Sequence, residues 1–126
     1  MLLFSKDRKK LTTQVYSVPK VAKSYILEPI AEFEVNALVT AADYDPVSKT
    51  LALTSYNFSG DQYLYRFTNF DLSNINNSKF EKYSIPVKPA QIEAIKVGDS
   101  STFWLTSEDE GDGSPRLFKA CLSEQF

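Results

Sequence analysis

The chain has 126 residues, of which 43% are hydrophobic and 13% aromatic, as in a folded globular domain and not in a disordered segment. Its 14 basic and 16 acidic side chains nearly balance, which argues against a nucleic-acid partner, and the lack of histidine excludes Ser-His-Asp catalysis and histidine-containing zinc sites. No apolar run approaches the roughly 20 residues that span a bilayer, so no transmembrane segment is predicted. The single cysteine, Cys121, is expected to be a small buried hydrophobe.

Short runs rich in Val, Ile, Thr, Tyr and Phe alternate with turn residues along the whole chain, which predicts an all-β fold. The expected strands are, in chain order, residues 2–6, 12–18, 26–35, 38–44, 50–56, 62–70, 80–86, 91–97, 101–107 and 116–122. Residues 71–77, DLSNINN, are expected to form a loop with at most one turn of 3₁₀ helix, because Asn and Ser favour turns over helix interiors.

The chain repeats itself with a period near 50 residues. LALTSY at 51–56 returns as FWLTSE at 103–108, an offset of 52, and residues 64–67 return as 117–120. Upstream, residues 2–5 and 15–18 match 51–54 and 64–67 at an offset of 49. One all-β unit over residues 1–126 is therefore expected, with repeats at approximately 1–37, 38–89 and 90–126.

Four strands per repeat of this length are typical of a β-propeller blade. We predict a partial β-propeller of about three four-stranded antiparallel blades, the first lacking its innermost strand A and the last lacking its outermost strand D. The alternative is a β-sandwich that happens to repeat. Because propellers usually have four to eight blades, the predicted partners are the missing blades of a longer chain, or a second copy that associates through the open blade faces.

Several motifs resemble a known family. The succession SKDR at 5–8, VYSVP at 15–19, VTAADYDP at 39–46, QIEAI at 91–95, LTSE at 105–108 and LFKACL at 117–122 resembles the C-terminal part of bacterial six-bladed propellers of the esterase-like phytase and SdiA-regulated-like type. The resemblance implies a protein of the periplasm, the cell surface or the medium, or one with a lipid anchor. Family members often carry an acidic residue where Ala41 stands.

Glu93 is the most prominent candidate side chain, because it interrupts an otherwise apolar innermost strand. A carboxylate that points towards a propeller axis can bind calcium through its oxygens, and we predict that Glu93, Glu108 and Asp43 line one mouth of the channel as metal ligands. The alternative is a structural carboxylate that accepts hydrogen bonds from backbone amides or from a neighbouring Tyr or Lys. The acidic loop at 108–113 lacks the spacing of an EF-hand and is expected to be a solvated hairpin loop.

Two functions remain open from the sequence. The first is a cell-envelope propeller that acts as a binding module for a small ligand or a protein. The second is a calcium-dependent hydrolase of an ester, lactone or phosphoester, with water as the nucleophile. The sequence favours binding, because no histidine is present to act as the general base and because a fold alone implies no activity.

Overall fold

The computed structural model of the chain describes residues 1–87, 90–108 and 115–123. These residues form ten β-strands and one short 3₁₀ helix, η1, so the predicted all-β class is confirmed. The elements are β1 (Leu2–Phe4), β2 (Thr13–Ser17), β3 (Ala31–Phe33), β4 (Leu38–Asp45), β5 (Thr50–Tyr56), β6 (Gln62–Phe67), η1 (Leu72–Asn77), β7 (Glu81–Ile85), β8 (Ile92–Val97), β9 (Thr102–Ser107) and β10 (Leu117–Cys121). No helix in these ranges is long and apolar enough to cross a membrane.

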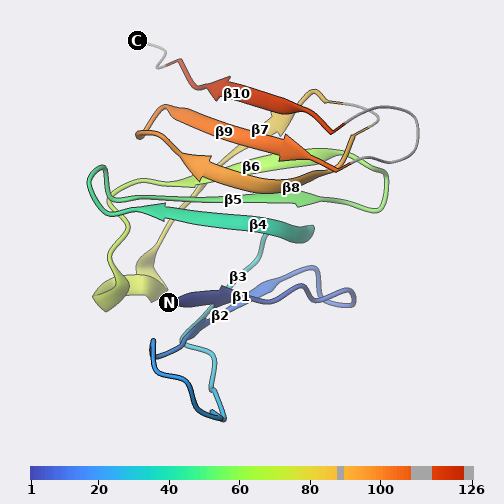
Figure 1. Cartoon of the computed structure of the whole chain (residues 1–126). Helices are drawn as coiled ribbons and strands as arrows, with labels where there is room; N and C mark the ends of the chain where they lie inside the picture. The colour runs from blue at the N-terminus through green and yellow to red at the C-terminus, as the bar shows by residue number, and fades with distance from the viewer. Residues whose placement is uncertain (88–89, 109–114, 124–126) are drawn as a thin grey trace.

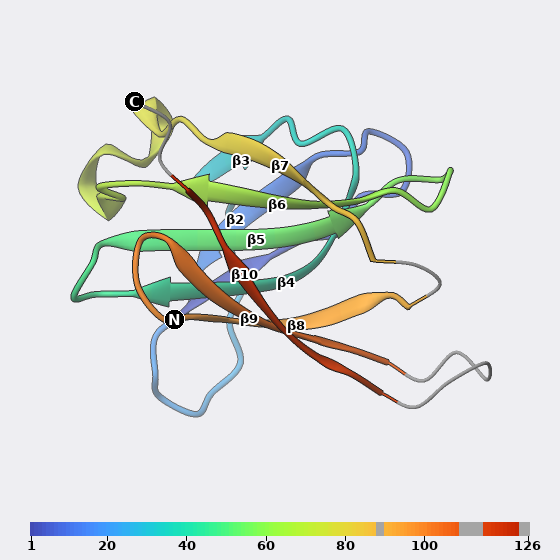
Figure 2. The same cartoon turned by 90° about the horizontal axis from the view of Figure 1, so that it is seen from above.

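The strands form three antiparallel sheets of three, four and three strands, in the orders β1-β2-β3, β4-β5-β6-β7 and β8-β9-β10. The sheets are stacked face to face, with the four-stranded sheet in the middle (Figure 1). Seen from above, the third sheet crosses over the second at an angle (Figure 2). The predicted set of three antiparallel sheets, of which the first and the third have one strand fewer, is confirmed. Such a stack fits a partial propeller and a sandwich alike.

The burial pattern of the strands follows from this stacking. β9 alternates between buried and more exposed residues, as a strand does when only one face of its sheet is covered. In β5, six of seven residues are buried, because the middle sheet is covered on both faces.

Two hydrophobic cores lie on the two faces of the middle sheet. The first core joins the first and second sheets and is rich in aromatic rings, among them Phe33, Phe67 and Phe70. The second core joins the second and third sheets and is mainly aliphatic around Phe103. Alternation along β5 explains the division, since Leu51 and Leu53 belong to the first core and Ala52 belongs to the second.

The innermost strands of the second and third sheets share an irregularity. β4 pairs with β5 through a register shift between Val39 and Ala41, and β8 pairs with β9 through a shift between Ile92 and Ala94. Thr40 and Glu93 are therefore the extra residues of two equivalent β-bulges. Aligned at these bulges, β4 and β8 are 53 residues apart in sequence, one more than the 52 between β5 and β9, because the turn before β9 is one residue shorter than the turn before β5.

Buried side chains of β6 hold the segments that connect the sheets. Gln62 donates from Nε2 to the carbonyl oxygens of Val87 (3.1 Å) and Ala90 (2.6 Å), and its Oε1 accepts from the Ile92 amide (2.7 Å). Tyr65 donates its hydroxyl to the Val35 carbonyl at 3.0 Å. Each connection between sheets is thus fixed by a polar side chain of the middle sheet, which satisfies backbone groups that would otherwise be buried without partners.

Two sequence predictions differ from the structure. The strand expected at 26–35 is limited to Ala31–Phe33, and Ile26 is fully exposed. Pro29 explains the late start, because proline lacks the N–H that a strand pairs and restricts the residue before it. Cys121 is exposed and not buried, since it ends β10, which lies at the edge of the third sheet.

Candidate functional site

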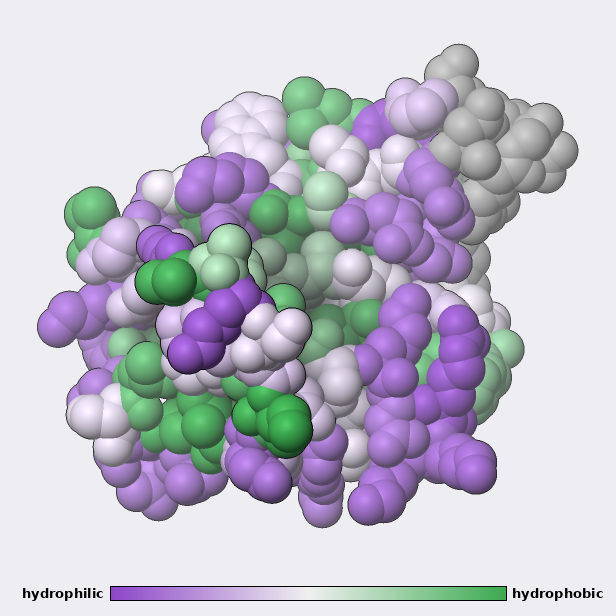
Figure 3. Space-filling view, turned by 60° about the horizontal axis from the view of Figure 1, so that its bottom comes forward, coloured by the Kyte–Doolittle hydropathy of each residue, from purple (hydrophilic) through white to green (hydrophobic). Residues whose placement is uncertain are grey.

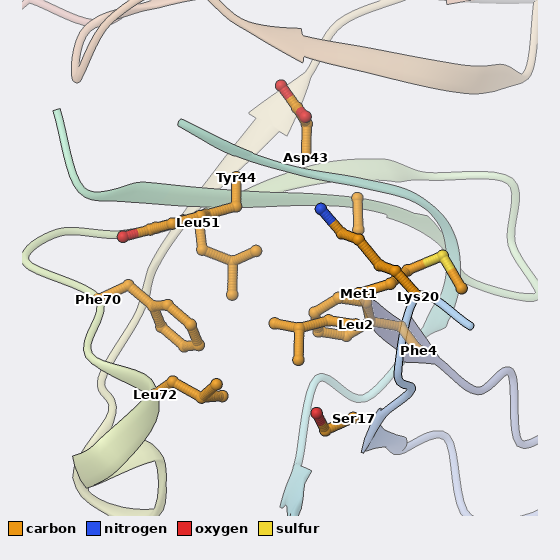
Figure 4. Close-up of a pocket in the computed structure, with 11 residues that line it drawn as sticks. Met1, Leu2, Phe4, Ser17, Lys20, Asp43, Tyr44, Leu51, Phe70 and Leu72 are labelled. Atoms are coloured by element: carbon orange, nitrogen blue, oxygen red, sulfur yellow. The ribbon is translucent and has the colours of Figure 1, made fainter. Parts of the chain in front are cut away.

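A cavity of about 620 Å³ opens between the first and second sheets, on the side of β1 and β4. Leu2 and Phe4 of β1 form one wall, and Tyr44 of β4 lies opposite, with Leu51 of β5 beside it (Figure 4). Ala42 of β4 also lines the cavity. Phe70 and Leu72, which lie before and at the start of η1, close the cavity at one end. The cavity is therefore lined mainly by apolar side chains from four separate segments.

The end of the cavity is fixed by the turn into η1. The Phe70 amide donates to the Lys49 carbonyl at 2.9 Å, and the Phe70 ring meets the rings of Tyr44 (5.6 Å) and Phe67 (6.1 Å) edge-on. Asp71 caps the helix by accepting from the Ser73 amide at 3.0 Å. Hydrogen bonds from the Ser73 hydroxyl and amide lower the pKa of the Asp71 carboxyl, so it stays ionised as a cap.

A few polar groups stand at the border of the cavity. Lys20, which follows β2, extends its amine towards β4, and Ser17 lies on the opposite side (Figure 4). A second pocket of about 380 Å³ adjoins the first and is more polar, with Lys49, Asn69 and Asp71 in its lining. On this side of the molecule, apolar surface is interspersed with polar side chains (Figure 3). The arrangement can bind an apolar group and hold an anionic one at its edge.

Asp43, one of the three predicted metal ligands, lies on β4 with its carboxylate turned away from the cavity (Figure 4). It accepts a hydrogen bond from the Val97 amide at 2.8 Å and pairs with the Lys96 amine at 3.2 Å. Its side chain is 25% exposed. In this structure Asp43 connects the inner strand of the second sheet to that of the third.

Glu93 and Glu108, the other two predicted ligands, lie near the opposite end of β8. The Glu108 amide donates to the Gln91 carbonyl at 3.0 Å, and the exposed carboxylate of Glu93 accepts from the Gln91 side-chain amide. Asp43 contacts the other end of the same strand, at Val97. The structure thus brings Glu93 near Glu108 and leaves Asp43 apart from both.

The calcium site stays a prediction. Within residues 1–87, 90–108 and 115–123, no three acidic or cysteine side chains gather as a metal-binding group. Residues 109–113 of the acidic loop lie outside the described residues. The position of Glu93 has a structural explanation, because it is the extra residue of a β-bulge and its side chain faces solvent.

Sequence reasoning missed the residues that line the cavity. Ala42 and Phe70 carry no motif, and their meeting depends on how two sheets pack. One signal did point to this place: the first repeat has one strand fewer than the second, and the cavity opens beside β1, the first strand of that sheet. Gln62 was also missed, although a glutamine at the start of an apolar strand indicates a buried polar contact.

Comparisons with protein-family models, with curated proteins and with solved structures found no match to this chain.

Proposed function

We propose that this chain is a three-blade part of a β-propeller that acts as a binding module, with the cavity between its first and second sheets as the ligand site. The observation that carries the proposal is this cavity of about 620 Å³, which has apolar walls and a lysine at its border. Concave, mainly apolar sites with a few polar groups are the usual form of small-molecule sites in proteins.

The repeated sheet order supports the propeller part of the proposal. Each sheet begins on the same side of the stack and adds its strands in sequence order, as blades do when they extend outward from an axis. The equivalent bulges in β4 and β8 support it further, because both lie in the strands that would line the axis. The family of six-bladed bacterial propellers, and with it a place in the cell envelope, belongs to this proposal through the motifs at 15–19, 39–46 and 91–95.

The missing blades, or a second copy, would cover the two outer faces of the stack. The outer face of the first sheet exposes Leu3, and that of the third exposes Trp104, whose ring lies under the Lys119 amine at 5.4 Å. Solution mass by light scattering tests this point. A discrete dimer supports closure between copies, whereas a monomer that binds a ligand in the cavity supports a module that works without closure.

The cavity is tested with a dye that combines an aromatic body with a sulfonate, anilinonaphthalene sulfonate. We expect saturable binding, with chemical-shift changes at the methyl groups of Ala42 and Leu51 that line the cavity. Replacing exposed Ala42 by Phe fills the space and should weaken dye binding by about tenfold or more, a loss of about 1.4 kcal/mol.

The matched control is Val47→Phe, which adds the same ring at a residue that is 92% exposed in the β4–β5 turn. Equal dye affinity for the wild type, Ala42→Phe and Val47→Phe would show that the dye does not bind in the cavity.

A further inference from the structure

A smaller pocket adjoins the cavity at the end that lies beside η1. It has a volume of about 380 Å³. Three residues line both the cavity and this pocket: Tyr44, Phe70 and Leu72. The other residues of the smaller pocket are polar, namely Lys49 in the turn between β4 and β5, Asn69 in the turn after β6, and Asp71 before η1. The two pockets therefore form one site with an apolar compartment, the cavity, and a polar compartment.

Two turns of the middle sheet shape the polar compartment. Lys49 (φ 53°) and Asn69 (φ 50°) both have left-handed backbone conformations, and each lies in one of these turns. The Phe70 amide donates to the Lys49 carbonyl at 2.9 Å and so joins the two turns. The polar side chains of the compartment thus come from segments that are already fixed to each other.

The polar compartment contains one positive and one negative charge. Hydrogen bonds from the Ser73 hydroxyl and amide lower the pKa of the Asp71 carboxyl, and the Lys49 amine lowers it further, so this group is ionised at neutral pH. Both bonds from Ser73 end on the same oxygen, Oδ1, which leaves Oδ2 available to a ligand. No salt bridge joins the Lys49 amine to a carboxylate among the described residues.

This pair of charges decides which ligands fit. A ligand that carries only a carboxylate is attracted by Lys49 and repelled by Asp71, and a ligand that carries only an amine meets the reverse. A ligand that carries both groups is attracted at both places. The side-chain amide of Asn69 can add a hydrogen bond to either group, because it both donates and accepts.

We propose that the site binds a small zwitterion with an apolar body, namely a free amino acid with a large apolar side chain. The ligand's ammonium pairs with Asp71 and its carboxylate with Lys49, while its side chain lies in the apolar compartment beside Leu51 and Phe70. At about 620 Å³, the apolar compartment has room for an aromatic side chain. This inference rests on the proposed function and names the ligand class of the same cavity.

The test uses the full chain, with L-phenylalanine and three analogues as probes. Each analogue lacks one part: 3-phenylpropionate lacks the ammonium, phenethylamine lacks the carboxylate, and L-alanine lacks the apolar body. Affinities are measured by NMR titration at the methyl groups of Ala42 and Leu51, which line the cavity. We expect L-phenylalanine to bind about tenfold or more tightly than each analogue.

Two variants assign the contacts of the zwitterion. Asp71→Asn keeps a side chain that caps η1 and removes its charge, so it should weaken L-phenylalanine by about tenfold without weakening 3-phenylpropionate. Lys49→Gln should weaken L-phenylalanine by a similar factor without weakening phenethylamine. The matched controls are Asp7→Asn and Lys79→Gln, because these residues line neither pocket and their replacement should leave every affinity unchanged. Unchanged spectra away from the site show that each variant folds.

The outcomes distinguish this inference from the function on which it rests. Dye binding in the cavity without a preference for L-phenylalanine over its analogues would overturn the zwitterion inference and leave the binding module intact. Failure of the dye and of all four probes to bind would overturn both. An affinity for L-phenylalanine that neither Asp71→Asn nor Lys49→Gln changes would also overturn the inference, because its charges would then lie outside the polar compartment. Lys20, for example, stands at the other end of the cavity from Phe70 (Figure 4).

Discussion

The two interfaces between sheets come from the same repeat but are built differently. Between the second and third sheets, β4 and β8 lie side by side and are joined by the hydrogen bond from the Val97 amide to Asp43, and Gln62 of β6 accepts from the Ile92 amide of β8. Between the first and second sheets, one inner strand is lacking, and the inner part of the interface is open as a cavity. The outer part is filled by rings, with Phe33 and Phe67 only 4.9 Å apart.

The difference shows how a repeat can be retained while its interfaces take separate roles. Aromatic packing on the outer strands holds the first sheet, since Phe33 of β3 meets Phe67 of β6 at 4.9 Å and Phe80 supports the Phe67 ring at 5.5 Å. The inner region is then free of the packing that a closed interface requires. A binding site can occupy it without a cost to the rest of the core.

The strongest test of this comparison uses two leucines, one in each interface. Leu105 is buried in the interface between the second and third sheets, here called the closed interface. Leu51 is equally buried but lies in the interface between the first and second sheets, the open interface, where it borders the cavity. Large-to-small changes cost about 2–5 kcal/mol, with the larger values where surroundings are tightly packed. We expect Leu105→Ala near the upper end and Leu51→Ala near the lower end, measured by urea unfolding at a constant m-value. Equal losses in the free energy of unfolding would mean that the side chains around the cavity are packed as tightly as those around Leu105.

The polar clamp of the closed interface gives the next largest effect. Replacing Gln62 by Ala leaves the carbonyls of Val87 and Ala90 and the amide of Ile92 without this partner. Buried groups that lose a hydrogen bond cost about 1–3 kcal/mol in the free energy of unfolding.

Gln62→Met is the matched variant, because it keeps the length of the side chain and removes the same three hydrogen bonds. Amide exchange at Ile92 should speed up strongly in both variants. Unchanged exchange in both variants would show that the connection between sheets is held by backbone packing alone.

Much of the fold could be predicted from the sequence, because turn residues and the long repeat are local signals. The number of strands, the order of the sheets and the short helix at DLSNINN all follow from them. The register was less accessible. The sequence aligns Leu2 with Leu51, yet Leu2 faces the neighbouring sheet as Ala52 does, one residue further on. A shift of one residue reverses the face of a strand and leaves the hydrophobic pattern almost unchanged.

The predicted metal site depended on the direction in which each carboxylate points, which the sequence does not specify. Glu93 lies in a strand, as predicted, but the bulge at this residue decides where its side chain points. Asp43 lies on the equivalent strand and contacts the far end of β8, because neighbouring inner strands meet along their length. Conversely, Cys121 is exposed because β10 has no outer neighbour among the described strands, which no local pattern reveals.

Tyr65→Phe tests a polar clamp of the open interface. The Tyr65 hydroxyl donates to the Val35 carbonyl and accepts from the Ser55 hydroxyl at 2.9 Å, and burial raises the pKa of this phenol. Removing the oxygen should cost about 1 kcal/mol, less than Gln62→Ala, because fewer buried groups lose a partner. A larger cost than that of Gln62→Ala would reverse the comparison and place the stronger polar clamp in the open interface. Both variants are compared by the same urea titration.

The smallest expected effect is the acid sensitivity of the closed interface. Arg66 binds the Glu81 carboxylate at 2.9 Å and the Ser100 carbonyl at 2.7 Å, so it links the second sheet to the turn before β9. Hydrogen bonds from Arg66 and Tyr83 lower the pKa of Glu81 below its ordinary value of 4.5. The ionised carboxylate therefore stabilises the fold above that ordinary value, and this contribution is lost as the pH falls through the lowered pKa. Because Glu81 is 51% exposed, water screens the pair and its contribution is at most about 1 kcal/mol.

The control for this acid effect is Glu81→Gln, which keeps the shape of the side chain and removes its charge. The free energy of unfolding of the wild type should fall more steeply below the ordinary carboxyl pKa than that of Glu81→Gln, and the two should differ most at neutral pH. The wild type also has lowered carboxyl pKa values at Asp71, which caps η1 beside the cavity, so part of its acid slope remains in the variant. Asp71→Asn removes the carboxyl group that caps η1 beside the cavity, so the free energy of unfolding of this variant should depend less on pH in the acid range than that of the wild type. If Glu81→Gln and the wild type lose stability in parallel, this ion pair does not contribute to the stability of the closed interface.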